Sequence, residues 1–178
     1  MIAGESFLKK QHRHLIGGQW VEPASGRMFD VLDPATGDII AQAPDGDASD
    51  IDRAVAAARQ AHEGAVWRGL TADARARILW RYAELLEANA EELAWLEVRN
   101  NGMPLGFAQW AIGASASWLR HYAGLTGNIL GQNASGAVSG GGNSLLAYTT
   151  RQPVGVAGLI LPWNGPIGSF IIKVAPAL

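Results

Sequence analysis

The C-terminal stretch, residues 154–178, constrains the fold more than any other part of the sequence. It carries one charged side chain, Lys173, and one side-chain amide, Asn164. Val154–Leu161 is a short apolar run with β-branched residues, which favours a buried strand of a parallel sheet covered on both faces. A turn cluster follows, and Ile167–Val174 is apolar enough to begin a buried helix. Asn164 would then lie at the carboxyl edge of the sheet, where open α/β sheets bind ligands.

The same stretch is long and apolar enough to raise the alternative of a transmembrane helix. Pro162, Pro166 and the Asn-Gly pair divide it into short runs, so we do not expect a membrane span. Pro166 suits the first turn of a helix, because its missing N–H would have no partner there.

Composition excludes several classes of function. The chain has 178 residues with 48% hydrophobic and 17% charged residues, which predicts one folded domain rather than disorder. A net charge of −2 gives no basic footprint for nucleic acid. The sequence has no cysteine, which excludes disulfides, thiolate metal sites and a cysteine nucleophile within it, and we expect no metal site. No secretory segment is evident at the N-terminus, and we expect a cytoplasmic protein.

Short strands and turns are predicted before residue 47. A Gly-Gly pair between short apolar runs predicts a hairpin over Leu15–Val21. Phe29–Leu32 and Asp38–Ala43 are strand candidates on either side of the Asp-Pro-Ala-Thr-Gly turn.

Four helices are predicted next. Asp47 or Ser49 can cap the first, whose apolar face begins at Ile51, and Thr71 can cap the second. Asn89 can cap a third helix, which stops near the Asn-Gly pair at 101–102. The fourth runs from Pro104 to about Thr126. We expect one face of it to point inward, made of Trp110, Ala114, Trp118, Tyr122 and Leu125.

Residues 128–143 are rich in Gly, Asn and Ser and predict a loop, and Ser144–Thr150 predicts a further strand. The strand and helix of the C-terminal stretch are then half of a βαβ crossover, whose next parallel strand must follow the helix. This pattern is typical of the front part of a larger α/β protein.

Several of these segments resemble the aldehyde dehydrogenase superfamily. The most specific are Pro153–Val156, Leu161–Pro166 and Lys173–Leu178. The upstream segments that agree are Ile16–Val21, Asp33–Gly37, Ile51–Ala58, Asn100–Gly102 and Pro104-Leu105. The resemblance runs from about Leu15 to Leu178 and corresponds to the N-terminal part of the family's chains.

The resemblance implies an enzyme that oxidises a small aldehyde to a carboxylic acid with NAD or NADP. In the family a cysteine thiolate attacks the carbonyl, and a glutamate activates the water that releases the acid. The counterpart of Asn164 donates its amide to the substrate oxygen, as part of an oxyanion hole. The spacing alone favours a plainer interpretation, an Asn that bonds to its own backbone in a turn.

The resemblance also assigns other residues of the closing stretch. Ile160, Leu161, Pro162 and Trp163, together with Asn164, match the segment that lies beneath the cofactor. They are equally compatible with the end of a core strand.

Lys173 matches a lysine that is frequent in the family. As the only charge in an apolar segment, it should be partnered or reach toward solvent.

One departure from the family concerns the substrate entrance. Many relatives carry an aromatic residue directly after the Asn and bulky residues on the same helix face. Here those positions are Gly165, Ser169 and Ile172, which share one face. We interpret this as an open entrance for a bulky, aromatic or branched aldehyde.

The predicted organisation is an incomplete Rossmann-like cofactor domain of the α/β class. It has an N-terminal part over 1–132, an oligomerisation arm over 133–153, and the first strand and helix start over 154–178. The family's catalytic domain, with its Cys and Glu, is absent from these residues, so we expect no activity from this chain alone. The alternatives are one half of a split enzyme, completed by a C-terminal chain, and a non-catalytic protein that binds full-length subunits.

Overall fold

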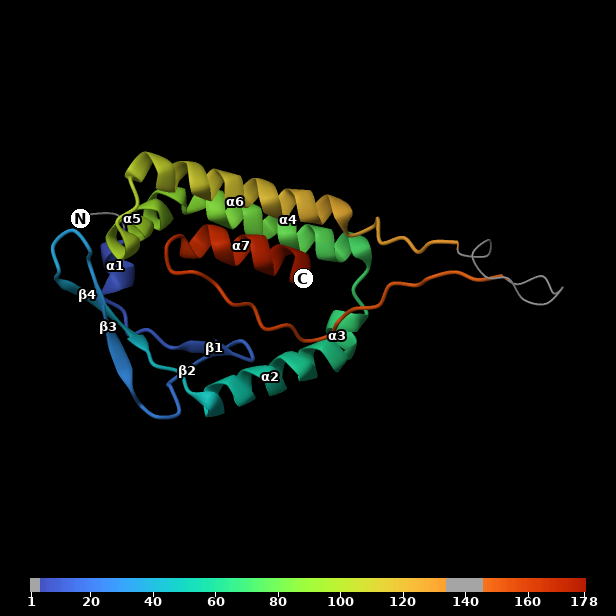
Figure 1. Ribbon diagram of the computed structural model, residues 1–178, viewed down its shortest axis with the longest axis horizontal. Helices are drawn as coiled ribbons and strands as arrows, with labels where there is room; N and C mark the ends of the chain where they lie inside the picture. The colour runs from blue at the N-terminus through green and yellow to red at the C-terminus, as the bar shows by residue number, and fades with distance from the viewer. Residues whose placement is uncertain (1–3, 134–145) are drawn as a thin grey trace.

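In a computed structural model, which describes residues 4–133 and 146–178, the chain forms a layer of helices beside two small hairpins (Figure 1). Seven helices and four strands occur in these residues. The helices are α1 (Glu5–Leu8), α2 (Ala48–Glu63), α3 (Ala65–Arg68), α4 (Ala72–Ala88), α5 (Ala90–Asn101), α6 (Leu105–Leu125) and α7 (Pro166–Ala177). The strands are β1 (His14–Ile16), β2 (Gln19–Val21), β3 (Met28–Leu32) and β4 (Ile39–Pro44).

The two hairpins confirm the strands predicted before residue 47. β1 pairs antiparallel with β2, and β3 pairs antiparallel with β4. Gly17 and Gly18 join the first pair with φ of 59° and 78°, the left-handed conformation that a tight hairpin turn requires at both positions.

The expected caps form at α2 and α4, whereas Asn89 does not cap α5, because its Nδ2 donates to the carbonyl of Leu85 instead. The Asp47 carboxylate accepts from the backbone N–H groups of Ser49 and Asp50, and the Asp50 side chain accepts from the N–H of Asp47. The Thr71 hydroxyl accepts from the N–H of Ala74 at the start of α4. α5 ends at Gly102, whose φ of 78° reverses the chain before α6.

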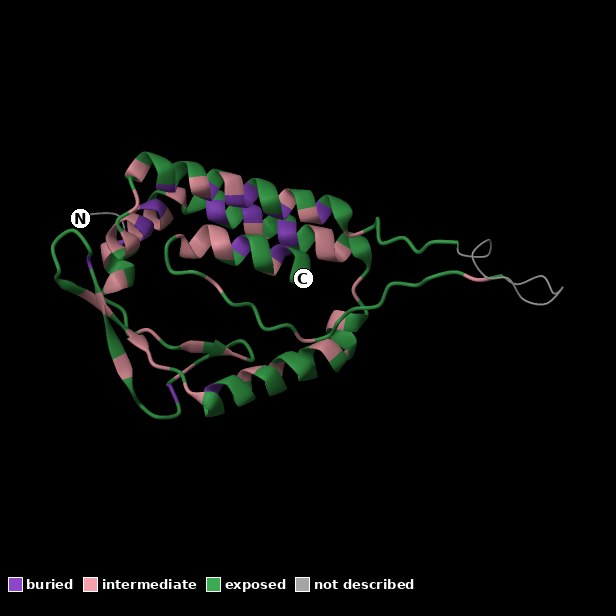
Figure 2. Cartoon of the chain, viewed as in Figure 1, coloured by how far each residue is buried: buried purple, intermediate pink, exposed green. Residues whose placement is uncertain are grey.

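The core lies between α4, α6 and α7, as the concentration of buried residues in Figure 2 shows. α6 packs against both other helices. The core residues are Leu79, Ala83 and Leu86 of α4, Ile112, Ala116, Leu119 and Ala123 of α6, and Ile171 and Ala175 of α7.

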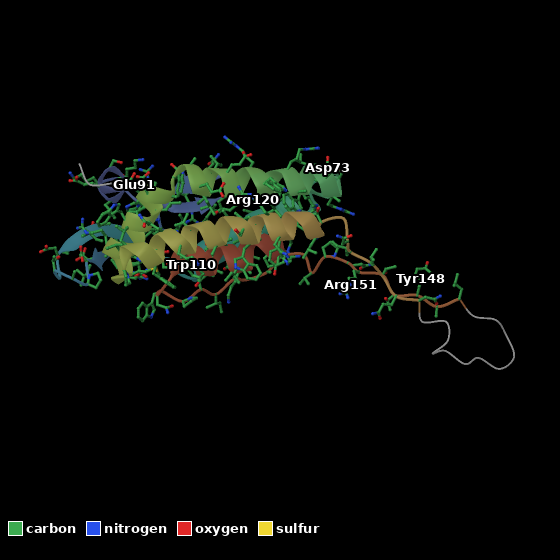
Figure 3. The ribbon with its side chains drawn as sticks, turned by 90° about the horizontal axis from the view of Figure 1, so that it is seen from above. Asp73, Glu91, Trp110, Arg120, Tyr148 and Arg151 are labelled. Atoms are coloured by element: carbon green, nitrogen blue, oxygen red, sulfur yellow. The ribbon has the colours of Figure 1, made fainter. Side chains whose placement is uncertain are left out.

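The predicted inward face of α6 was wrong for Trp110, Trp118 and Leu125, whereas Tyr122 packs against the core as expected. Trp110 is 64% exposed and Trp118 is 43% exposed, while the buried face is made of Ala108, Ile112, Ser115 and other small or aliphatic residues. Small side chains let two helices approach closely, and indole rings would hold them apart. The small residues therefore face the partner helices, and Trp110 lies on the outer side of α6 (Figure 3).

The apolar face of α2 is also not buried in this structure. Ile51 is 62% exposed and Val55 is 41% exposed. The one buried residue of α2 is Asp50, so this helix is attached through polar contacts.

The predicted buried strand over Val154–Leu161 does not form. This segment has an extended backbone without strand pairing, and Val154 and Ile160 are 94% and 85% exposed. A parallel strand needs a neighbouring strand for its N–H and C=O groups. The sheets of the described residues are two separate two-stranded hairpins, and neither pairs with this segment.

The segment predicted as an arm, 133–153, is described only at its ends, because 134–145 lie outside the described residues. The two ends lie side by side. Asn133 and Tyr148 form an isolated antiparallel bridge, and the N–H of Thr149 donates to the carbonyl of Gln132 at 2.8 Å. Figure 3 shows Tyr148 and Arg151 on this extended pair, away from the helices. The strand predicted over Ser144–Thr150 is therefore reduced to a single bridge within its described part.

Candidate functional site

Asn164 lies in the turn that joins the extended segment to α7. Asn164 is exposed, and Trp163 before it is 80% exposed. Gly165 is the N-cap of α7, with an extended φ of −177°, and Pro166 is the first helical residue, as predicted. The carbonyl of Gly165 accepts from the N–H of Ser169 at 3.0 Å, which fixes the first turn directly after Asn164. The backbone hydrogen bonds therefore fix the helix start directly after Asn164, whose side chain is exposed.

Glu97 of α5 caps this helix start, although sequence reasoning did not identify it. Its Oε1 accepts from the backbone N–H of Ile167 at 2.8 Å, across 70 positions of sequence. Glu97 is 3% exposed. Its position was a usable signal, because Leu93 and Glu97 are four residues apart and share a face of α5. A carboxylate on an otherwise apolar face indicates a specific donor.

The loop after α5 approaches the same turn. The Nδ2 of Asn101 donates to Oε2 of Glu97 at 2.5 Å, and its Oδ1 accepts from the N–H of Met103 at 2.9 Å. A Cβ atom built on Gly165 would stand 3.7 Å from Cε of Met103. Residues of α5 and of the loop after it therefore lie against the turn that carries Asn164.

α5 is itself fixed to the second hairpin by a buried ion pair. Arg99 Nε lies 2.5 Å from Oδ2 of Asp33, which is 4% exposed. The backbone N–H of Ala35 and the guanidinium of Arg99 lower the pKa of Asp33 below its ordinary value. This carboxylate therefore stays ionised and fastens α5 to the end of β3.

The residues predicted to lie beneath the cofactor form a largely exposed segment. Ile160 is 85% exposed, Pro162 and Trp163 are exposed, and Leu161 is half-buried. Lys173 of α7 is partnered, since its Nζ donates to the carbonyl of Ile160 at 2.7 Å. This hydrogen bond fastens the segment before Asn164 to α7.

The predicted substrate-entrance residues point away from the core. Ile171 and Ala175 give α7 its buried stripe, whereas Ile172 is 49% exposed and Gly165 and Ser169 are half-buried. At 100° per residue, Gly165, Ser169 and Ile172 fall on one flank of the helix, roughly 110° around its axis from this stripe. The structure therefore brings these three positions to one face, next to Asn164.

The two best-defined hollows among the described residues lie elsewhere. One, of about 460 Å³, lies between α1 and the β3–β4 hairpin, and another, of about 570 Å³, lies on the outer face of α4. Neither is lined by the residues around Asn164, so within the described chain the site is an open surface. Residues 4–133 and 146–178 contain no cluster of three His, Cys, Asp or Glu that could hold a metal ion. No helix in these ranges is long and apolar enough to cross a membrane.

Comparison with known proteins gives one consistent result. Residues 20–178 match the model of the aldehyde dehydrogenase family. A phenylacetaldehyde dehydrogenase of Pseudomonas fluorescens is 44% identical over 176 residues, which cover 96% of this chain and 34% of that protein. A mitochondrial benzaldehyde dehydrogenase of Antirrhinum majus is 42% identical over 165 residues, which cover 92% of this chain and 30% of that protein. The chain thus spans about a third of the length of these relatives.

Solved structures give the same answer for the fold. The NAD⁺ complex of an aldehyde dehydrogenase from Bacillus cereus superimposes with a TM-score of 0.89 at 38% identity, over 97% of this chain and 34% of that one. An indole-3-acetaldehyde dehydrogenase superimposes with a TM-score of 0.86 at 34% identity, over 98% of this chain and 39% of that one. The incomplete Rossmann-like α/β class is confirmed by these likenesses. By sequence and by fold, the chain belongs to the aldehyde dehydrogenase family.

Proposed function

We propose that this chain is the N-terminal part of an NAD(P)-dependent aldehyde dehydrogenase and supplies one donor of its oxyanion hole. The observation that carries the proposal is the exposed amide of Asn164, held directly before the capped start of α7. The motif around it lies within the residues that match the family.

The chemical role of Asn164 follows from charge. When a nucleophile adds to an aldehyde carbonyl, the oxygen becomes negative, and the Nδ2 group of Asn164 can donate to it. A donor held in place before the reaction needs no reorganisation, and its loss typically costs about 10²–10³ in rate. The positive end of the α7 dipole favours the same charge.

The cofactor would lie on the surface formed by Ile160, Leu161, Pro162, Trp163 and Asn164. NAD or NADP, when bound, accepts the hydride that leaves the aldehyde carbon. The residues of this chain would bind and orient the cofactor through apolar contact. They would also keep water from one side of the reacting carbon. The NAD⁺ complex of the Bacillus cereus relative supports NAD as the cofactor.

This chain alone is proposed to be inactive, because it contains no cysteine to serve as nucleophile. The nucleophile and the base glutamate would come from residues beyond these 178. They could belong to the same polypeptide or to a complementing C-terminal chain, which makes this chain one half of a split enzyme. The exposed extended segment 154–161 favours either form of completion, since it offers a strand without a neighbour.

A non-catalytic protein that binds full-length subunits is the second candidate. It is favoured by the antiparallel ends of the arm over 133–153, which extend from the helical layer (Figure 1). We propose that this arm joins subunits of a homo-oligomer. Residues 1–132 and 154–178 would then belong to the cofactor-binding domain. We also propose a cytoplasmic location. Binding of this chain to an intact relative without any gain of activity would favour this candidate.

The substrate is proposed to be a bulky, aromatic or branched aldehyde. Gly165, Ser169 and Ile172 leave this face of α7 without an aromatic side chain. Two of the relatives are named for phenylacetaldehyde and benzaldehyde, both aromatic aldehydes. We expect a preference for such substrates over acetaldehyde.

The proposed function is tested in a hybrid enzyme, in which this whole chain replaces the matching third of the Pseudomonas fluorescens relative. We expect the hybrid to oxidise phenylacetaldehyde with NAD, and Asn164→Ala to lower kcat by about 10²–10³. Asn164→Asp is the matched variant, since it keeps the shape but replaces the N–H donor with a carboxylate oxygen. An Asn164→Ala hybrid with unchanged kcat would contradict the proposed role of Asn164.

A further inference from the structure

Glu97 is a buried carboxylate that the proposed reaction does not use. It is 3% exposed and lies on α5, next to the start of α7. A carboxylate is seldom fully buried unless its charge is compensated by hydrogen bonds. Here both oxygens are used, one by the N–H of Ile167 at 2.8 Å and the other by Nδ2 of Asn101 at 2.5 Å.

The first of these bonds replaces a cap that α7 does not have. The first N–H groups of a helix have no partner within it, and a Ser, Thr, Asp or Asn at the N-cap usually supplies one. The N-cap of α7 is Gly165, which has no side chain, and no side-chain cap is formed from within the helix. Glu97 supplies the acceptor from a different helix, and its negative charge matches the helix dipole.

The second bond connects Glu97 to the opposite side of the turn. Asn101 bonds both to Glu97 and to the N–H of Met103. Met103 in turn stands beside Gly165, the residue that follows Asn164. One carboxylate therefore restrains both the helix after Asn164 and the loop that packs against its neighbour.

We propose that Glu97 is a positioning residue that fixes the amide of Asn164 through the N-terminus of α7. The inference rests on the proposed role of Asn164. Without an acceptor at position 97, the partly buried N–H of Ile167 loses its partner, so the first turn of α7 loosens. Asn164 lies three residues before Ile167, and a shift of about 1 Å in a reacting group can cost on the order of 10²-fold in rate.

A cap that only stabilises the fold would behave differently. It would change the free energy of unfolding, and any loss of rate would not depend on Asn164. A residue that acts through Asn164 loses its effect on kcat once that amide is gone. The two roles are therefore separated by combining substitutions at both positions.

The experiment uses the hybrid enzyme with Glu97→Met, which keeps the length of the side chain without an acceptor, and with Glu97→Gln, which keeps one acceptor. We expect Glu97→Met to lower kcat by about 10-fold to 100-fold with KM within about 3-fold, and Glu97→Gln to restore kcat to within about 3-fold. In the Asn164→Ala background, we expect Glu97→Met to change kcat by less than about 3-fold. Glu91→Gln, on the exposed side of α5, is the control, and Figure 3 shows Glu91 far from the arm.

Amide hydrogen exchange measures the cap independently of activity. We expect faster exchange in residues 167–170 in Glu97→Met than in Glu97→Gln. Unchanged exchange would overturn the positioning role of Glu97, and so would a loss of kcat in Glu97→Met that is equal with and without Asn164. The proposed function would still stand in these cases if Asn164→Ala alone had a large effect on kcat. If Asn164→Ala alone had no effect on kcat, both the proposed function and this inference would be wrong.

Discussion

Asp50 is the residue that attaches α2 to the rest of the chain. It is 2% exposed, accepts from the N–H of Ala24 at 3.0 Å and from the N–H of Asp47 at 3.1 Å, and pairs with Arg53. Nε2 of His14 lies 3.7 Å from the same carboxylate. One side chain thus joins α2, the loop after β2 and the strand β1, where few apolar side chains are buried.

The first prediction concerns the stability of this cluster in acid. The pKa of Asp50 is lowered from 3.8 to about 2. The largest cause is the hydrogen bond from the backbone N–H of Asp47, and the hydrogen bond from the Arg53 side chain adds to it. A lowered folded-state pKa gives stability that is complete above about pH 4 and is lost as the pH falls toward about 2. Urea unfolding of the chain at several pH values should therefore show that the free energy of unfolding declines across this window. The decline should be smaller in Asp50→Asn. Asp52→Asn, at an exposed position of α2, should leave the decline unchanged.

The second prediction concerns Gly165 and the choice of substrate. Its extended φ suits any residue, and a Cβ atom there would make an ordinary contact of 3.7 Å with Met103. In the hybrid enzyme, Gly165→Phe should lower kcat/KM for phenylacetaldehyde by about 10-fold or more relative to acetaldehyde, because the ring fills the entrance. Gly165→Ala is the matched small variant and should change this ratio little. Equal losses for both substrates would argue against an open entrance.

At the scale of elements, the C-terminal stretch shows what sequence patterns can predict. The proline at 166 and the apolar run after it predicted α7, because these are local preferences of the backbone. Val154–Leu161 carries an equally clear strand pattern, yet it pairs with nothing in the described chain. Strand formation depends on a partner, and the sequence of the strand alone does not contain one.

α6 shows a second limit of sequence patterns. Its aromatic residues and its small residues both recur at helical spacing, so periodicity predicts a buried face without deciding which of the two it is. Close approach by α4 and α7 selects Ala116, Leu119 and Ala123. Glu97 was missed for a related reason, since its donor belongs to α7, 70 positions away.

The third prediction tests the packing of α7. Ile171 is 0% exposed in the core, whereas the adjacent Ile172 is 49% exposed. Ile171→Ala should lower the free energy of unfolding by about 2–5 kcal/mol, because it leaves a cavity between α7 and α6. Ile172→Ala removes the same atoms from an exposed position and should cost about 0.5 kcal/mol or less. Urea denaturation of the two variants measures their free energies of unfolding. Equal losses of this free energy would mean that α7 does not pack as described.

At the scale of the whole molecule, the chain exposes far more surface than a compact protein of its mass. Its accessible area is 12010 Å². A folded monomer of 18.8 kDa is expected to expose about 8,300 Å². The excess is partly apolar, since Val154, Ile160 and Trp163 are at least 80% exposed along one extended segment and its turn. An exposed apolar surface of this kind is typical of an interaction site.

The last prediction is that the isolated chain self-associates through this segment. An exposed apolar segment without strand pairing can pair with a second copy. Size-exclusion chromatography with light scattering should therefore give a mass above 18.8 kDa that rises with concentration. Val154→Lys combined with Ile160→Lys should shift the chain toward the monomer, because charged side chains oppose strand pairing. Val66→Lys, at a position 85% exposed on α3, is the control and should not shift it. A monodisperse monomer at all concentrations would show that the exposed segment needs no partner.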